Sequence, residues 1–338
     1  MKKLNLIANQ MVAKGKGILA ADESTPTCTK RFESIGVEST FESRNEYRGM
    51  LFTTTCIEEY ISGVIMFDET LRQSTTCSDN IPFTTLLRSK GILPGIKVDM
   101  GAKPLAGFSN EKITEGLDGL RERLADYYKI GARFAKWRAV ITIGDSMPSD
   151  ACIYSNAHSL ARYASLCQEN GLVPIVEPEI LMNGSHTIEN CYEVSERTLN
   201  AVFEQLLMHH VELDGIVLKP NMVISGLDCS EQADVEKVAD LTFNCLKDNV
   251  PSDVPGNAFL SGGQSSDLAT FHLNKMNEKY GNDMPWNLSF SYGRALQEDA
   301  LKAWGGVNIK EAQKALLFRA HANSLATKGL AAKVMQNS

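Results

Sequence analysis

Two stretches of the sequence decide the fold: residues 172–180 read LVPIVEPEI and residues 214–221 read DGIVLKPN. Each is a short run of Val, Ile and Leu that ends in charged side chains next to a proline. Such a run is typical of a β-strand that is covered on both faces, as in a parallel sheet. Residues 193–210 between them, EVSERTLNAVFEQLLMHH, have the periodicity of an amphipathic helix. This part of the chain is therefore predicted to be a strand, a helix and a second strand.

The same pattern continues in both directions along the chain. Further apolar segments, each bounded by Gly or Pro, are GILAAD near 17, ISGVIMF near 61, LPGIKVD near 93, ARFAKWRAVI near 132, NAFLSGG near 257 and NLSFSYG near 287. Helical periodicity also marks residues 116–130, 155–170 and 231–247.

Strands thus alternate with helices eight times, which predicts the α/β class and a (β/α)₈ TIM barrel as a single domain over residues 1–338. A doubly wound open sheet is the alternative, but it would normally carry a GxGxxG turn after its first strand, and the sequence has none. The C-terminal segment is short and polar, so we expect it to fray after about residue 326.

Composition limits the classes of partner. The 338 residues are 43% hydrophobic, enough for a large core, and carry a net charge of −7. That balance offers no basic field for nucleic acid. The N-terminus, MKKLNLIANQMVAKGKG, lacks the apolar run of a signal peptide, and no stretch is long enough to span a membrane. We expect a cytoplasmic protein that binds neither nucleic acid nor membranes.

Cysteine and histidine spacing gives no sign of a metal site. The eight cysteines include no CxxC pair, which indicates reduced, mostly buried thiols. The six histidines show neither HxxxH nor HExxH spacing. We therefore expect no metal and no cofactor.

Charged and hydroxyl side chains gather where the predicted strands end, which is where barrels of this class build their active sites. Alternation along a strand places Lys136 and Arg138 on the same face of their strand, and Glu177 and Glu179 on the same face of theirs. Buried charges persist only when they are paired or used, so this set predicts a functional site. Its members, from the first strand to the eighth, are Asp22, Lys97, Lys136, Arg138, Glu177, Glu179, Lys219, Ser261 and Ser291.

Lys219, at the end of the apolar run GIVLK, is the candidate nucleophile. Burial there, together with a nearby cation such as Lys136, is expected to lower the pKa of its amine and leave it able to attack a carbonyl. The adjacent carboxylates can supply a general acid and a general base. This combination suits a Schiff-base reaction that cleaves a carbon–carbon bond in a ketose.

The last two strands are followed by glycines and an arginine in the segments LSGGQ and SYGRA. Barrels commonly bind phosphate there, through backbone N–H groups and the N-terminus of the next helix. The guanidinium of Arg294 adds a fork of donors that matches phosphate oxygens. We therefore predict a phosphate site at Gly262, Gly263, Gly293 and Arg294.

These segments together carry a family resemblance. GILAADES, GIKVD, FAKWR, VPIVEPEIL, LKPNMV, FLSGGQS, SFSYGRALQ and LKAWGG resemble, in the same order, blocks of the class I fructose-bisphosphate aldolases, and the likeness runs from about residue 5 to about 328. The resemblance implies reversible cleavage of fructose 1,6-bisphosphate to dihydroxyacetone phosphate and glyceraldehyde 3-phosphate in glycolysis and gluconeogenesis. It also implies sugar phosphates as ligands and a homotetramer.

The resemblance assigns residue roles as well. Lys219 is implied to form the Schiff base, Glu177 to transfer protons with Glu179 assisting, and Asp22 and Lys136 to act on the carbon-4 hydroxyl. The implied binding residues for the carbon-1 phosphate are Ser261, Gly262, Gly293 and Arg294, those for the carbon-6 phosphate are Ser24, Thr27 and Lys97, and Arg138 and Arg31 line the same cleft.

The sequence departs from the pattern of animal members at two places. Pro26, where glycine is common, removes an N–H from the carbon-6 phosphate loop, and Thr27 stands where serine is common. No tyrosine follows Tyr292, so we expect the C-terminus to contribute little to catalysis.

Two other functions stay open at this point. A different Schiff-base aldolase or a transaldolase would also use a lysine at a strand end, and a non-catalytic barrel could serve as a scaffold. A metal-dependent aldolase is disfavoured by the histidine spacing.

Overall fold

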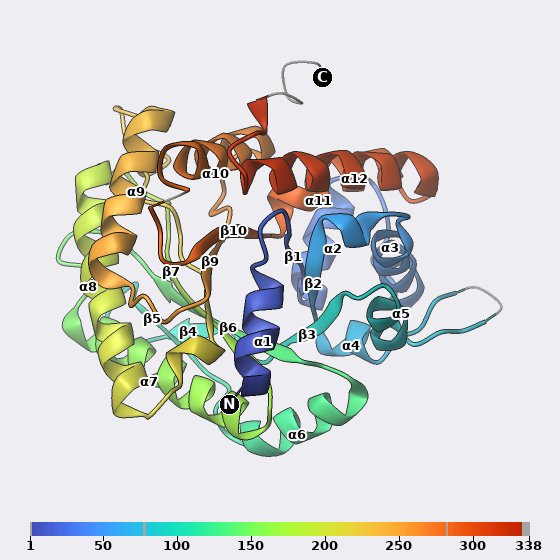
Figure 1. Cartoon of the computed structure of the whole chain (residues 1–338), viewed down its shortest axis with the longest axis horizontal. Helices are drawn as coiled ribbons and strands as arrows, with labels where there is room; N and C mark the ends of the chain where they lie inside the picture. Colours follow the sequence, from blue (N-terminus) through green and yellow to red (C-terminus); the bar gives the residue numbers. More distant parts are fainter. Residues whose placement is uncertain (1, 77–78, 282, 333–338) are drawn as a thin grey trace.

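The computed structural model describes residues 2–76, 79–281 and 283–332, and shows a closed parallel barrel with helices around it (Figure 1). Neighbouring strands follow the order β1-β10-β9-β8-β7-β6-β3-β2. The predicted (β/α)₈ barrel is thereby confirmed. Its strands are β1 (Gly17–Ala21), β2 (Ile61–Met66), β3 (Leu93–Lys97), β6 (Phe134–Ile141), β7 (Val173–Ile180), β8 (Val217–Leu218), β9 (Gly256–Phe259) and β10 (Asn287–Tyr292).

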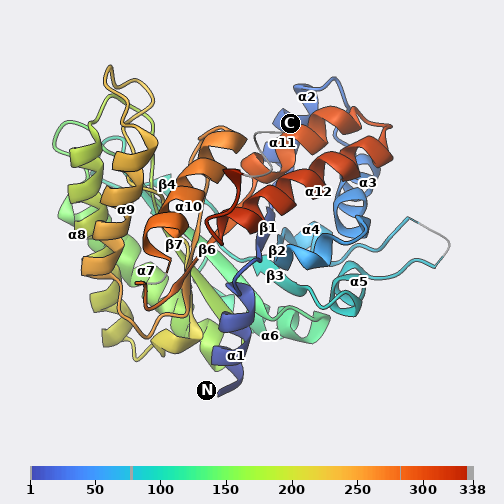
Figure 2. The same cartoon turned by 45° about the horizontal axis from the view of Figure 1, so that its top comes forward.

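Helices cover the outside of the barrel. Figure 2 shows α12 lying across α11, close to α3, and α8 running beside α9. The helices are α1 (Lys2–Met11), α2 (Thr25–Glu33), α3 (Phe41–Thr53), α4 (Asp68–Leu71), α5 (Phe83–Ser89), α6 (Leu120–Ile130), α7 (Asp150–Glu169), α8 (Ile188–Met208), α9 (Val235–Asn249), α10 (Ser266–Tyr280), α11 (Arg294–Trp304) and α12 (Ile309–Ala326), with 3₁₀ turns at Ile57–Glu59 and Leu213–Gly215.

Four consecutive long helices begin at side-chain caps. The side chains of Ser149, Thr187, Asp234 and Ser265 accept hydrogen bonds from the third backbone amide of α7, α8, α9 and α10 respectively. Each cap satisfies an amide that has no partner inside its helix, which is worth about 1 kcal/mol. These caps fix where each loop from the barrel ends.

The interior of the barrel is closed at the end where the strands begin. Apolar side chains of α1, among them Ile7, Ala8 and Met11, pack on inward-facing residues such as Ile18 and Phe134. α1 is visible in front of the strands in Figure 1. The opposite end, where the strands finish, is left for polar side chains.

Three features were not predicted from the sequence. β4 (Ala102–Pro104) and β5 (Lys112–Thr114) form a small antiparallel hairpin outside the barrel. β8 is only two residues long. Fraying was expected after about residue 326, but the described residues that follow α12 are packed. Thr327 and Ala331 are buried, and the Ala331 amide donates to Asn274 Oδ1 at 2.7 Å. The rest of that segment, residues 333–338, lies outside the described residues.

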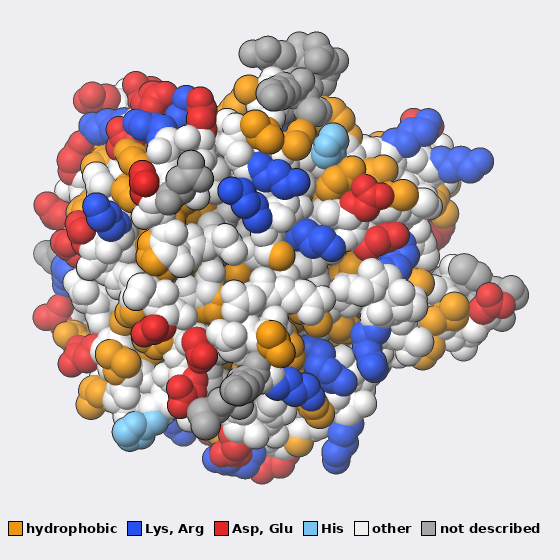
Figure 3. Space-filling view, viewed as in Figure 1, with side chains coloured by type: hydrophobic (Ala, Val, Ile, Leu, Met, Phe, Trp, Pro, Cys, Tyr) orange, Lys and Arg blue, Asp and Glu red, His pale blue; other side chains and the backbone are white. Residues whose placement is uncertain are grey.

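The surface and the thiols agree with the composition. Acidic and basic side chains are interspersed over the face in Figure 3. Seven of the eight cysteines, all but Cys77, are described, and each is a free thiol. Within the described residues, no helix is both long and apolar enough to cross a membrane.

Candidate active site

A polar cavity of about 690 Å³ opens at the carboxyl ends of the strands. Its lining includes every residue that the sequence predicted for the site: Asp22, Ser24, Thr27, Arg31, Lys97, Lys136, Arg138, Glu177, Glu179, Lys219, Ser261, Gly262, Gly263, Ser291, Gly293 and Arg294. The cavity is large enough for a phosphorylated sugar, and binding sites of this size are typical for small molecules.

The centre of the cavity is a cluster of buried charges on three neighbouring strands. Lys219 follows β8, and its Nζ lies 3.1 Å from Glu177 Oε1. The other Glu177 oxygen, Oε2, lies 3.5 Å from Lys136 Nζ. Glu177 thus connects the two lysines, each of which is 4% exposed. We call Lys219, Glu177, Lys136 and Asp22 the floor of the cavity.

Asp22, directly after β1, completes this cluster. Its Oδ2 lies 2.8 Å from Lys136 Nζ. Burial alone would raise the pKa of Asp22, but the charges of Lys136, Lys219 and Lys97 outweigh it and lower that pKa to about 2. The same pairing acts on Lys136: burial opposes its charge, but Asp22, Glu177 and Asp99 together raise its pKa. At neutral pH, Asp22 is a carboxylate and Lys136 an ammonium.

Glu179, which was expected to assist Glu177 in proton transfer, pairs with Arg138 and not with Lys219. Its carboxylate contacts the guanidinium of Arg138 on β6. Among the described residues, no ion pair or hydrogen bond joins Glu179 to Lys219. The alternation of β7 does bring Glu177 and Glu179 to the same face, yet only Glu177 reaches the lysine.

Two buried acids that sequence reasoning overlooked organise the cations. Asp99 Oδ1 lies 2.6 Å from Lys97 Nζ, and its Oδ2 lies 3.9 Å from Lys136 Nζ. Glu23 contacts Arg31 and lies 2.6 Å from Arg48. Asp99 could have been predicted from the sequence, because it follows Lys97 by two residues in GIKVD and so continues the same face of the strand. Nothing local in the sequence marks Arg48, which reaches Glu23 from α3.

One side of the cavity, the glycine rim, consists of Ser261, Gly262, Gly263, Gly293 and Arg294. Gly262 and Gly263 have φ angles of 54° and 85°, in the left-handed region that favours glycine, and a Cβ on Gly263 would lie 2.6 Å from Met182 Sδ. Arg294 begins α11, and its guanidinium forms no hydrogen bond or ion pair with any other described residue. Nearby, the buried Ser291 hydroxyl is without a described partner. This side therefore presents unused donors.

The other side, the α2 rim, consists of Ser24, Thr27, Arg31 and Lys97. Ser24 occupies the N-cap position of α2 without a side-chain cap bond to the backbone, and its Oγ lies 3.2 Å from Thr27 Oγ1. Pro26 falls in the first turn of α2, where a helix does not use the missing N–H, so it does not disturb the helix.

The arrangement combines an amine, a proton carrier and an anion site. Six cations and four carboxylates line the cavity, so it is locally positive in a chain of net charge −7. A lysine amine next to a carboxylate can attack a carbonyl and exchange protons with it. The cations and backbone donors on both rims can hold phosphate groups.

Comparison with known proteins agrees with this chemistry. The family described as fructose-bisphosphate aldolase class-I matches residues 3–338. A protein of Xanthomonas axonopodis named "Probable fructose-bisphosphate aldolase class 1" is 55% identical over 97% of this chain and 98% of its own. "Fructose-bisphosphate aldolase 4, cytosolic" of Arabidopsis thaliana is 53% identical over 97% of this chain and 84% of its own.

A solved structure shows the same fold. Fructose-bisphosphate aldolase of Plasmodium falciparum, in complex with TRAP and a small-molecule inhibitor, superposes with a TM-score of 0.95. It is 48% identical and covers 97% of this chain and 95% of its own. The site geometry, the family match and these relatives lead to one conclusion: the chain belongs to the family of class I fructose-bisphosphate aldolases.

Proposed function

We propose that Lys219 carries out the aldolase reaction by forming a Schiff base with the ketose carbonyl. The observation that carries this proposal is the 3.1 Å contact between Lys219 Nζ and Glu177 Oε1 inside a locally positive cavity. Proton transfer from the ammonium to Glu177 frees the amine. The amine adds to carbon 2 of the sugar, and the protonated Glu177 then gives its proton to the departing water.

Carbon–carbon cleavage follows on the iminium. The iminium withdraws electrons from the bond between carbons 3 and 4, and a base removes the proton of the carbon-4 hydroxyl. Asp22 is ionised at neutral pH, and Lys136 beside it stabilises the alkoxide that develops. Glyceraldehyde 3-phosphate leaves first, and protonation of the enamine then releases dihydroxyacetone phosphate.

The substrate is fructose 1,6-bisphosphate, with one phosphate on each rim. The carbon-1 phosphate binds to the glycine rim, where Arg294 and backbone donors are free. The carbon-6 phosphate binds to the α2 rim. Glu179 holds Arg138 toward the cleft through its ion pair and does not transfer protons.

Borohydride reduction in the presence of dihydroxyacetone phosphate, followed by peptide mass spectrometry, tests the proposal. We expect one trapped lysine, Lys219, and unchanged activity in EDTA because the iminium serves as the electron sink. An adduct on Lys97 or Lys136, with Lys219 unmodified, would overturn the assignment. Loss of activity with chelator that zinc restores would overturn the metal-independent mechanism.

We further propose that the protein works in the cytoplasm as a homotetramer. Support for the compartment comes from the relative named as cytosolic. The tetramer rests on the family resemblance alone. Size-exclusion chromatography with light scattering tests the assembly, and a monomer at micromolar concentration would contradict it.

A further inference from the structure

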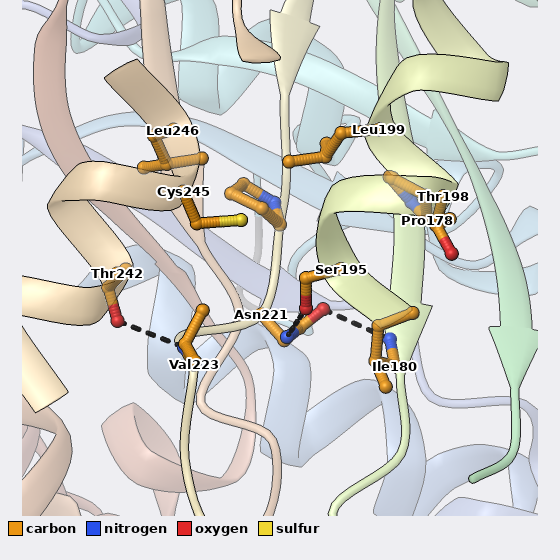
Figure 4. A pocket seen from close by; sticks show the side chains of 11 residues that line it. Pro178, Ile180, Ser195, Thr198, Leu199, Asn221, Val223, Thr242, Cys245 and Leu246 are labelled. Atoms are coloured by element: carbon orange, nitrogen blue, oxygen red, sulfur yellow. Dashed lines mark hydrogen bonds between the residues drawn. The ribbon is translucent and has the colours of Figure 1, made fainter. Parts of the chain in front are cut away.

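Behind the floor of the cavity, on the outer face of β7, lies a second, enclosed space. It is lined by Pro178 and Ile180 of β7, by Asn221 after β8, and by side chains of α8 and α9 (Figure 4). Its volume of about 10 Å³ is at the lower limit for a single water molecule, so it is not a ligand site. The polar side chains that face it need another explanation.

The strand pairing between β7 and the Lys219 segment is interrupted by a proline. β8 pairs with β7 only through Val217 and Leu218, and the Lys219 amide makes the last regular bond, to the Val176 carbonyl at 2.8 Å. The next donor of a parallel ladder would be the amide of residue 178, but proline has no N–H. Pro220 faces the other neighbouring strand, β9, and its carbonyl accepts a hydrogen bond from the Leu260 amide at 3.1 Å. The backbone alone therefore leaves Lys219 fixed to β7 on one side only.

The side chain of Asn221 supplies the missing connection. Its Oδ1 accepts a hydrogen bond from the Ile180 amide at 3.0 Å, a buried contact drawn in Figure 4. Its Nδ2 donates to the Met222 carbonyl at 3.1 Å and to Ser195 Oγ at 3.4 Å. With both donors directed away from β7, the amide oxygen must face Ile180.

The Lys219–Val176 and Asn221–Ile180 hydrogen bonds lie on either side of the contact between Lys219 and Glu177. On β7, Val176 and Ile180 lie on either side of Glu177, and on the other strand Lys219 and Asn221 lie on either side of Pro220. The Lys219 segment is thus tied to β7 above and below the level at which Lys219 meets Glu177. A shift of about 1 Å between reacting groups can cost about 10²-fold in rate.

We propose that Asn221 is a positioning residue that holds Lys219 in register with Glu177 by replacing the ladder bond lost at Pro178. It does not touch the substrate. The inference rests on the proposed role of Lys219 as the Schiff-base lysine.

The test compares Asn221→Ala with Thr242→Val and Ser195→Ala. Thr242 lines the same space, but its hydroxyl accepts from the Val223 amide and does not tie Lys219 to β7. Ser195→Ala removes the long bond to Nδ2 and a 4.0 Å contact with Cys191 Sγ, and it leaves the Ile180 bond in place. For Asn221→Ala we expect kcat to fall about 10- to 100-fold, KM for fructose 1,6-bisphosphate to stay within about twofold, and borohydride trapping of Lys219 to slow by the same factor as kcat.

Both control variants are expected to keep kcat within about threefold, even where they lower the melting temperature. Normal kcat and trapping rate in folded Asn221→Ala would overturn the inference, as would an equal loss in Thr242→Val. Failure of the wild-type protein to trap at Lys219 would instead overturn the proposed function, so the two failures are distinguishable.

Asn221→Asp keeps the test decisive if Asn221→Ala does not fold. A protonated carboxyl can accept from Ile180 and donate to Met222, whereas a carboxylate is repelled by the Met222 carbonyl and so loses the orientation in which it meets the Ile180 amide. The kcat of this variant relative to wild type is therefore expected to decline as the pH rises through the titration of the introduced carboxyl group. A ratio that stays constant from pH 5 to pH 8 would overturn the inference.

Discussion

The two rims of the cavity hold their cations in different ways. On the α2 rim, Arg31 contacts Glu23, and Lys97 lies 2.6 Å from Asp99, so both cations already have a carboxylate partner. On the glycine rim, Arg294 has no hydrogen-bond or ion-pair partner among the described residues. A phosphate reaching Arg294 breaks no existing pair, whereas a phosphate on the α2 rim must compete with two carboxylates. We therefore expect the glycine rim to bind a phosphate group more tightly than the α2 rim does.

This difference has a physical origin in burial. Asp99 and Glu23 have side chains that are only 3% and 7% exposed, and buried carboxylates need a cation nearby. Each such carboxylate orients its cation before substrate arrives, but it also lowers the gain from binding an anion. The glycine rim uses backbone geometry in place of ion pairs to prepare its site.

The largest expected effect comes from the floor, which serves both rims. Glu177→Gln keeps the shape of the side chain but removes its proton-transfer capacity, so kcat should fall by about 10²-fold or more. KM should change little, because neither rim is altered. Steady-state kinetics with fructose 1,6-bisphosphate measures both. Glu179→Gln is the matched control, and a larger loss in the control would transfer the proton role to Glu179.

On the glycine rim, Arg294→Ala should lower kcat/KM by about 10²-fold. A charge-assisted hydrogen bond contributes about 1.5–3 kcal/mol, and each 1.4 kcal/mol corresponds to a factor of ten. The loss should be similar for fructose 1,6-bisphosphate and fructose 1-phosphate, since both carry the carbon-1 phosphate. Arg294→Lys keeps the charge without the fork and should recover part of the activity. A loss confined to the bisphosphate would mean that Arg294 serves the other phosphate.

On the α2 rim, Thr27→Val removes one neutral donor while preserving shape. A neutral hydrogen bond contributes about 0.5–1.5 kcal/mol, so kcat/KM for the bisphosphate should fall by up to about tenfold. Fructose 1-phosphate has no group for this rim, and its kcat/KM should not change. If both sugars are affected equally, the two rims are not assigned to separate phosphates and the comparison fails.

The sequence was sufficient to predict the barrel because each strand is a short apolar run with its own boundaries. The site followed from the same reading, since charges at strand ends must meet at one end of a closed barrel. Ion pairs between distant segments were not predictable: Arg48 of α3 meets Glu23 through packing of helices, and Glu179 pairs with Arg138 and not with Lys219. Short-range pattern carries no information on such partners.

The C-terminal segment was misjudged for a similar reason. Residues 327–331 look polar and unremarkable in sequence, yet Thr327 accepts a hydrogen bond from the Gly15 amide at 2.8 Å. Its burial depends on a partner more than 300 residues away, the separation being 312. Propensity in the segment itself could not reveal that contact.

The smallest expected effect concerns this segment, which supports the glycine rim from behind. The Ala331 amide donates to Asn274 of α10, the helix that follows the Gly262–Gly263 turn. Deleting the residues after Gly329 removes this bond and should lower the free energy of unfolding by about 1 kcal/mol. Because no described atom of the segment lines the cavity, cleavage should change by less than about threefold.

Solvent-hydrogen exchange into dihydroxyacetone phosphate should also survive the deletion, since Glu177 lies next to Lys219 and can return the proton to the enamine. A deletion after Ala332 is the control, because it keeps the Ala331–Asn274 bond. If exchange collapses in the control while cleavage to the enamine persists, the terminal residues take part in proton transfer. If only the longer deletion weakens binding of the carbon-1 phosphate, the segment acts through α10 on the glycine rim. Phosphate binding there would then depend on the C-terminal segment as well as on Arg294.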